Sequence, residues 1–285
     1  MISLNAGAVT ATGAFYLGQN NRNLQKSLVR LSAGLRANSA ADDPAGLSVS
    51  MKLMLAIRHN EEASTNVNSA VSFLQTQDGA LAVADSILLR MGELASRASS
   101  STISTSDRAL YDAEVDSLKD SLGTLFSDTF NGTNLFQNSN TGIPSTSSTM
   151  VVDTGLENQT VGVSIADLGS VTYYVGSTAS AGIDLSTAEA AASASASIGS
   201  AINNLAALRA TNGAQQNRMV FAMDLLAVNK LNLEAANSRI VELDSATEIA
   251  KYTKYTILDQ SNIVLVSQAN LRADNALQLL EIDKN

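Results

Sequence analysis

Residues 23–50 read NLQKSLVRLSAGLRANSAADDPAGLSVS, and this stretch decides the fold. It begins with leucines at steps of four, three and four: Leu24, Leu28, Leu31 and Leu35. That spacing places the four side chains on one narrow face of an α-helix, and such a face needs a partner helix along its length. We therefore expect a first helix that packs against a distant part of the chain.

The same stretch contains the start of a second helix at Asp43 and Pro44. An N-cap aspartate accepts hydrogen bonds from the free amides of the first turn, and proline at the next position lacks a donor that would be unsatisfied there. The apolar stripe that follows predicts a helix of about fifty residues, far longer than the globular average. Met51 and Met54 fall on this stripe, and we expect them to fill gaps in a core.

Small polar side chains predict a turn at residues 99–105, where Ser104 and Asp107 form a capping pair for a third helix. That helix is expected to end at the turn signal Asn131-Gly132. The next segment is rich in Ser, Thr and Gly. Its β-branched runs predict the only β-structure of the chain, in short strands at 150–152, 161–165 and 171–175.

Helical signals return at Ser186, which with Glu189 matches a capping box ahead of an alanine-rich segment. The C-terminal segment again carries an apolar stripe. The predicted fold is mainly α: a long antiparallel helical coiled-coil or bundle built from the N- and C-terminal halves, with a small strand-containing central insert. The expected segments are terminal helices at 1–40 and 245–285, halves of a long helical domain at 41–137 and 186–244, and the insert at 138–185.

Charge and hydropathy argue against two classes of partner. The 285 residues carry a formal net charge of −9 without a cluster of Lys and Arg, so no nucleic acid is expected. No membrane is expected either, because no apolar run reaches the length of about 18 residues that a spanning helix needs. The first 21 residues contain no charged side chain, so the basic region of a signal peptide is missing.

The residue types that most catalysis and metal binding require are also scarce. Cysteine is absent and His59 is the only histidine, which excludes thiolate sites, histidine triads and multi-histidine metal sites. The adjacent carboxylates Asp42-Asp43 and Glu61-Glu62 point in different directions on a helix and form no facing pair. We therefore expect no enzyme, no catalytic residue, no cofactor and no metal.

The two ends of the chain are expected to order only against neighbouring copies. Ordering a residue costs about 1–2 kcal/mol of backbone entropy, and burying a large aliphatic side chain returns about 1.5–3 kcal/mol. A lone pair of terminal helices has too few such side chains to offset that cost. The residues expected to form the assembly interface are Leu24, Leu28, Leu31 and Leu35 near one end and Leu258, Ile263, Leu265, Leu271, Leu277 and Leu280 near the other.

Five motifs extend over most of both halves of the chain. On the N-terminal side they are SLVRLSAGLRANSAADDPAGLSVS at 27–50 and QTQDGALAVADSILLRMGELASRA at 75–98. On the C-terminal side they are GAQQNRM at 213–219, NLEAANSRIVELDSATEIAKYTK at 232–254 and ILDQSNIVLVSQAN at 257–270. In this order they resemble the N- and C-terminal signatures of the bacterial flagellin family.

The resemblance implies a structural subunit that polymerises into the bacterial flagellar filament, the helical propeller for swimming motility. In that family the paired terminal helices line the inner core of the filament, the adjoining long helices form an outer tube, and the middle faces solvent. Residues 38–46 resemble the connection between core and tube. Pro44 stands there where many relatives have alanine, which should stiffen the connection.

The family also implies partners besides other copies of the chain. These are the flagellar type III export apparatus, an export chaperone, and the filament cap and junction proteins. The chain would be exported without a cleaved signal peptide and lie outside the cell in the flagellum. The positions at which some flagellins contact the innate Toll-like receptor are occupied here by Arg90, Glu93, Leu94 and Glu114.

Two other functions remain open at this point. A hook-filament junction protein shares the terminal architecture of flagellins, although the near-complete match at 27–50 favours the major subunit. A helical adhesin or secreted effector could use the same export route, although the matches at both ends count against it. Failure of the purified chain to form long filaments would favour the junction protein.

Overall fold

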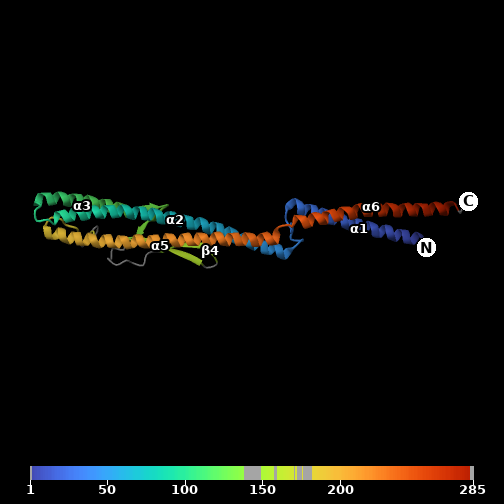
Figure 1. Ribbon diagram of the computed structural model, residues 1–285, viewed down its shortest axis with the longest axis horizontal. Coiled ribbons are helices and arrows are strands. Elements are labelled where there is room, and N and C mark those ends of the chain that lie inside the picture. Colours follow the sequence, from blue (N-terminus) through green and yellow to red (C-terminus); the bar gives the residue numbers. More distant parts are fainter. Residues whose placement is uncertain are drawn as a thin grey trace. The chain divides into compact units, whose positions relative to one another are not determined.

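The computed structural model describes the backbone of residues 2–137, 149–156, 159–169, 171, 175 and 182–282 (Figure 1). Side chains are described at 10–137, 162–169, 171, 175, 182–272 and 275. The chain divides into two compact units. Unit 1 combines residues 1–56 with 232–285, and unit 2 consists of residues 57–231.

Long helices make up most of the described backbone, which confirms the mainly α fold that the sequence predicts. They are α1 (Ile2–Ala33), α2 (Pro44–Ala98), α3 (Thr105–Leu125), α5 (Ala188–Val241) and α6 (Ser245–Ile282). α2 has 55 residues and α5 has 54. Helices of this length are stabilised by packing along an apolar face rather than by propensity alone.

In unit 1, α1 and α6 lie side by side and run antiparallel (Figure 1). α1 ends at Gly34, whose positive φ of 69° suits a residue without a Cβ and whose N–H donates to the Arg30 carbonyl at 2.8 Å. The chain then pairs briefly with the end of α5. The N–H of Arg36 donates to the Val241 carbonyl at 2.8 Å, and the N–H of Leu243 donates to the Gly34 carbonyl at 3.1 Å.

In unit 2, the helical residues 57–98 of α2 and 188–231 of α5, together with α3, enclose an apolar core. The apolar stripe of α2 is buried from Val67 onward, except at Val71, which is partly buried. The largest fully buried apolar side chains are Phe73, Leu74, Leu81, Leu88, Met91 and Leu94 from α2, Leu122 from α3, Leu168 and Leu185 from the connecting segments, and Ile198, Leu205 and Met219 from α5.

In the described residues between α3 and α5, the structure has six short strands. β1 (Thr129–Phe130) and β2 (Thr133–Asn134) form an antiparallel hairpin whose turn residues Asn131 and Gly132 both have positive φ, at 50° and 79°. β4 (Thr149–Leu156) pairs antiparallel with β5 (Gln159–Ser164), with an irregularity between Asp153 and Leu156. β3 (Phe136–Gln137) pairs in parallel with β6 (Ala166–Asp167).

The strands differ from the sequence prediction in two respects. β4 and β5 contain most of the predicted runs at 150–152 and 161–165, but the predicted strand at 171–175 is wrong for its described residues, because Val171 and Val175 are helical and buried. In addition, β1, β2 and β3 precede residue 138, where no strand is expected. Two-residue bridges such as these arise from tertiary contacts and leave no periodic signal.

Side-chain hydrogen bonds identify the N-cap residues of α3 and α5. Ser104 caps α3, since its Oγ accepts from the Asp107 N–H at 3.2 Å. α5 begins one residue later than the capping box at Ser186 predicts. Its first-turn amide at Ala190 donates to Oγ1 of Thr187 at 3.1 Å, so Thr187 is the N-cap.

Candidate assembly surface of the terminal helices

Unit 1 buries polar side chains and leaves large apolar side chains exposed, over the residues whose side chains are described. Among its described side chains, those that are buried are Ser27, Ser50 and Glu248, and none of them is apolar. Ser27 Oγ donates to Glu248 Oε1 at 2.8 Å, and Ser50 Oγ donates to Asn237 Oδ1 at 2.8 Å. Unit 1 is therefore held together within one chain mainly by polar contacts and half-buried aliphatic side chains.

The predicted assembly residues of α1 and its C-terminal connection form a partly covered stripe. Leu24, Leu31 and Leu35 are half-buried. Leu28 is 52% exposed. The predicted stripe is thus partly covered at Leu24, Leu31 and Leu35 and open at Leu28.

The predicted assembly residues of α6 are more exposed than those of α1. Ile263, Leu265 and Leu271 are each more than half exposed, and Leu258 is 37% exposed. The side chains of Leu277 and Leu280 lie outside the described part of the chain. Over these described side chains, α6 therefore presents large aliphatic residues that stay between 37% and 59% exposed.

The structure also exposes apolar residues of unit 1 that the sequence prediction omits. Those on α1 and α6 are Phe15, Tyr16, Val29, Ile249, Ile257 and Val264. Met51 and Met54 of α2 are 64% and 51% exposed, so the prediction that they fill a core is wrong for the single chain. Periodicity shows which residues share a helix face, but it does not show whether the same chain covers that face.

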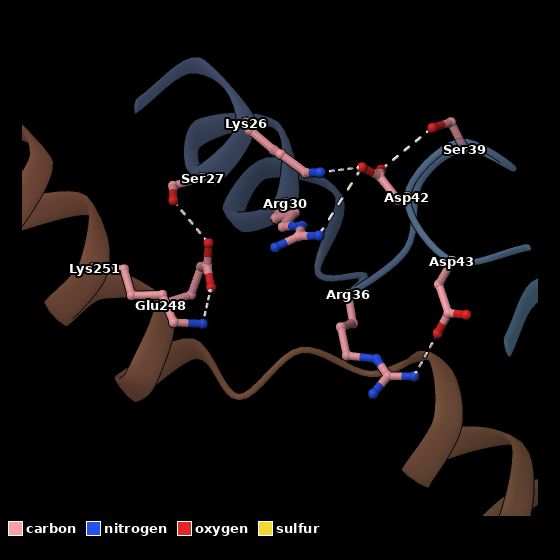
Figure 2. A network of polar contacts seen from close by, with 9 residues as sticks. All are labelled: Lys26, Ser27, Arg30, Arg36, Ser39, Asp42, Asp43, Glu248 and Lys251. Atoms are coloured by element: carbon pink, nitrogen blue, oxygen red, sulfur yellow. Dashed lines mark hydrogen bonds and ion pairs between the residues drawn. The ribbon is translucent and has the colours of Figure 1, made fainter. Parts of the chain in front are cut away.

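A network of polar side chains joins the end of α1 to the connection that follows it (Figure 2). Lys26 Nζ lies 2.6 Å from Asp42 Oδ1, and Ser39 Oγ donates to Asp42 Oδ2 at 3.3 Å. The hydrogen bond from Lys26 lowers the pKa of Asp42 from its usual value of 3.8. Arg30 Nη2 approaches the same carboxylate at 4.0 Å, while its buried Nε has no hydrogen-bond partner among the described residues.

Glu248 lies on the α6 side of the same region, between Ser27 and Lys251 (Figure 2). Burial raises the pKa of this carboxyl, but the hydrogen bonds from Ser27 and from Lys251, whose Nζ is 3.0 Å from Oε2, outweigh that effect. The net result is a pKa below the usual 4.5. Glu248 is therefore ionised at neutral pH and holds α1 and α6 together as a charged acceptor.

Asp43 and Pro44 occupy the start of α2. The Gly46 N–H donates to Asp43 Oδ1 at 2.8 Å, and Arg36 Nη2 lies 3.1 Å from Asp43 Oδ2. A Cβ at residue 46 would overlap this carboxylate, with the Asp43 Cγ only 2.8 Å away, so a larger residue there would require the Asp43 side chain to shift. The two adjacent carboxylates thus have different basic partners: Asp42 pairs with Lys26 and Arg30, and Asp43 pairs with Arg36.

The residues at the receptor-contact positions lie in unit 2. Arg90 Nε and Nη2 lie 2.8 and 2.7 Å from Glu114 Oε1, and Arg90 Nη1 lies 3.2 Å from Glu93 Oε2. The hydrogen bond with Glu114 contributes most to raising the pKa of Arg90. Leu94 is fully buried, so only the three charged residues form a surface cluster.

The described residues offer no arrangement for metal or membrane chemistry. Among them, no group of three or more His, Asp or Glu side chains could hold a metal ion. None of the helices, over the residues described, combines the length and apolar character that crossing a membrane requires. The arrangement suits contacts between protein surfaces, because its most distinctive feature is uncovered apolar side chains on long helices.

Comparison with known proteins agrees with this picture at both ends of the chain. Residues 4–141 match the bacterial flagellin N-terminal helical region, and residues 196–280 match the bacterial flagellin C-terminal helical region. A structure described as a putative flagellar hook-associated protein from Vibrio parahaemolyticus is similar to 70% of this chain and all of that chain, with a TM-score of 0.57 and 14% identity. That likeness bears on the fold alone.

Two curated relatives are similar along nearly the whole chain. The flagellar filament 30.7 kDa core protein of Treponema maltophilum is 34% identical over 93% of this chain and 94% of its own length. Flagellin of Bacillus subtilis (strain 168) is 34% identical over 93% of this chain and 95% of its own length. With both family regions matched in order, the chain belongs to the bacterial flagellin family.

Proposed function

We propose that this chain is the structural subunit that polymerises into a bacterial flagellar filament, the helical propeller for swimming. One observation carries the proposal. Among its described side chains, unit 1 buries only polar ones, while large apolar side chains along α1 and α6 are exposed in the single chain. Burying such side chains against other copies would supply the stabilisation that one chain lacks.

The interface between copies is formed by the terminal helices. Its residues are Leu24, Leu28, Leu31 and Leu35 with Leu258, Ile263, Leu265, Leu271, Leu277 and Leu280. Segments 1–40 and 245–285 form the inner core of the filament, segments 41–137 and 186–244 form the outer tube, and segment 138–185 faces solvent. Asp43 and Pro44 fix the connection between the inner and outer parts, which the cap at Gly46 supports.

Membership of the family supports the remaining partners. The chain is exported through the flagellar type III apparatus with an export chaperone, and it meets the filament cap and junction proteins outside the cell. Recognition by a Toll-like receptor would rest on Arg90, Glu93 and Glu114, the exposed members of the predicted set. No catalytic role is proposed.

Polymerisation of single-residue variants tests the function. Leu265 is 56% exposed, so Leu265→Asp leaves the fold of the free subunit intact but places a charge in the apolar contact. We expect this variant to form no filaments by electron microscopy under conditions in which the unaltered chain forms long ones. Leu265→Met preserves volume and apolar character and is expected to polymerise. An unaltered chain that fails to extend even on filament seeds would contradict the proposal and favour a junction protein.

A further inference from the structure

A stripe of large apolar side chains lies exposed on α5, within unit 2. Phe221, Leu225 and Val228 are spaced by four and three residues, which places them on one face of the helix, and they are 72%, 49% and 55% exposed. Val220 and Leu231 flank this face and are also exposed. We call these five residues the α5 stripe.

The α5 stripe is a local feature of its helix. The opposite side of α5 carries Met219 and Leu226, which are buried in the core of unit 2. Along the outer face before the stripe, the exposed residues are small or polar: Asn203, Ala210, Ala214 and Asn217. A contiguous group of large exposed apolar side chains in a chain of −9 net charge indicates a surface that another protein covers.

A second apolar surface lies on unit 1, at the start of α2. An open groove of about 610 Å³ is lined by Ala40, Pro44, Leu47, Ser48, Met51, Lys52 and Leu55. Met51 and Leu55 are 64% and 59% exposed, one helical turn apart on the same face. We call this surface the α2 groove.

We propose that the α5 stripe of one copy packs into the α2 groove of a neighbouring copy. Both surfaces follow the rows of side chains at i and i+4 on a helix, the geometry in which ridges of one helix fit the grooves of another. The proposal rests on the filament function, and it adds a specific contact to the terminal-helix interface.

Charge favours this pairing over the alternatives. Lys52 lines the groove, and Asp224 lies along the edge of the stripe between Phe221 and Leu225. In the part of the chain that the structure describes, no ion pair occupies Lys52 or Asp224. If the α5 stripes of two copies packed on each other, their two Asp224 carboxylates would lie close together and repel. Packing of the α5 stripe into the α2 groove instead brings Asp224 of one copy toward Lys52 of the other.

The symmetry of the contact also fits a filament. A surface that pairs with itself closes a dimer, but two different surfaces on one chain give a head-to-tail contact that continues from copy to copy. The α5 stripe and the α2 groove are two such surfaces. Their pairing is of the head-to-tail type, from which an open helical polymer, the assembly that the proposed function requires, is built.

Cross-linking between copies tests the proposal directly, because the chain contains no cysteine of its own. Met51→Cys and Leu225→Cys are prepared as separate full-length chains, mixed in equal amounts, polymerised and treated with a short bismaleimide. We expect a covalent dimer in filaments of the mixture, and none in the unpolymerised mixture or in filaments of either variant alone. Both positions are exposed, so neither substitution disturbs the core of the subunit.

The cross-linking results distinguish failure of the proposed contact from failure of the filament function. Filaments that form from the mixture without a cross-link would overturn the contact but leave the filament function intact. A dimer within filaments of Leu225→Cys alone would show that stripes pair with each other, which also overturns the proposal. Failure of the unaltered chain to polymerise would count against the function itself.

A charge exchange gives an independent test if either cysteine variant fails to polymerise. Lys52→Glu or Asp224→Lys alone is expected to raise the subunit concentration needed for polymerisation by about two- to fivefold, the range for a screened ion pair. The double variant should return this concentration to within about twofold of the original. Single variants whose effects simply add in the double variant would overturn the proposed contact.

Discussion

Glu248 shows how a single buried charge links acidity to the pairing of α1 and α6. Its folded-state pKa lies below 4.5, the value that applies when the residue is exposed in the unfolded chain. A carboxyl of this kind contributes stability that is fully present above about pH 4.5 and is lost as the pH falls through the folded-state pKa. The reason is that the unfolded chain takes up the proton first.

We expect Glu248→Gln to flatten the acid dependence of filament stability. At neutral pH the variant loses the charged acceptor for Ser27 and Lys251, which costs about 1–3 kcal/mol. Below pH 4.5 the unaltered filament loses stability more steeply than the variant, because the variant has no carboxyl to protonate there. Sedimentation of filaments across this range measures both effects, with the exposed Glu242→Gln as the matched control. Parallel pH profiles for the unaltered and Glu248→Gln filaments would contradict the argument.

At Asp43, the cap and the ion pair can be separated by two substitutions. Asp43→Ala removes both the acceptor for the Gly46 N–H and the partner of Arg36, and it is expected to cost about 0.5–2 kcal/mol. Asp43→Asn keeps the acceptor and loses only the charge, so it should retain most of the helix start. Amide exchange at Gly46 and Leu47 measures the difference. Equal exchange rates in the two variants would show that the ion pair, rather than the cap, holds this turn.

At the scale of elements, α2 and α5 are joined by a buried amide network as well as by apolar packing. Asn212 Nδ2 donates to Gln77 Oε1 at 2.7 Å, and Gln77 Nε2 donates to the Leu135 carbonyl at 2.6 Å. Gln216 Nε2 donates to Asn212 Oδ1 at 2.6 Å. Only one axial alignment of the two helices satisfies all of these groups, so the network favours a single register.

Substitutions in this network are expected to be non-additive. Gln77→Leu removes the acceptor for one hydrogen bond of Asn212 Nδ2 and the donor to the Leu135 carbonyl, and it should lower the free energy of unfolding by about 1–3 kcal/mol. Gln77→Leu with Asn212→Leu replaces two facing amides by apolar groups, so the double variant should lose less than the sum of the single losses. Urea unfolding of the unpolymerised chain gives these values. If the loss in the double variant equals the sum of the two single losses, the two amides do not act together.

Neighbouring leucines on α2 provide a matched test of the core. Leu88 is fully buried, whereas Leu89 is 52% exposed. Leu88→Ala is expected to destabilise unit 2 by about 2–5 kcal/mol because it leaves a cavity. Leu89→Ala should change stability by no more than about 0.5 kcal/mol. Urea unfolding measures both variants. Similar losses in the free energy of unfolding would mean that α2 buries a different face from the one that carries Leu88.

These elements also show what sequence can and cannot predict. Heptad spacing predicts the helices and, from Val67 onward, the buried face of α2. It fails at Met51 and Met54, because a stripe requires a partner without specifying whether that partner belongs to the same chain. Helical spacing does not predict the α5 stripe at Phe221, Leu225 and Val228, because spacing alone does not show which apolar face of a helix stays exposed.

The site of unit 1 was predictable in outline but not in its interior. Leucine spacing predicts the apolar residues of α1 and α6, including Leu28 and Leu265. It cannot predict that Ser27 and Glu248 are buried, because a polar residue in an amphipathic pattern is normally assigned to solvent. Their burial depends on a contact across more than two hundred positions of sequence, with the Ser27–Glu248 pair separated by 221.

At the scale of the whole molecule, the uneven distribution of apolar burial predicts that stability is uneven. One face of α2 from Val67 to Ala95 lies in the core of unit 2, while no described apolar side chain of unit 1 is buried. Segments with few buried apolar contacts open with free energies close to zero. The terminal helices of a free subunit should therefore open readily while unit 2 remains folded.

Hydrogen exchange tests this coupling of folding to assembly. In the unpolymerised chain, we expect amides of residues 10–33 and 245–272 to exchange nearly as fast as in an unfolded chain, with residues 67–95 protected as the internal control. In filaments all three segments should be protected, because neighbouring copies bury the exposed leucines and isoleucines and offset the entropy of ordering the helices. Strong protection of the terminal segments in the free subunit would mean that polar contacts such as Ser27–Glu248 suffice to fold unit 1. Assembly would then join surfaces that are already folded.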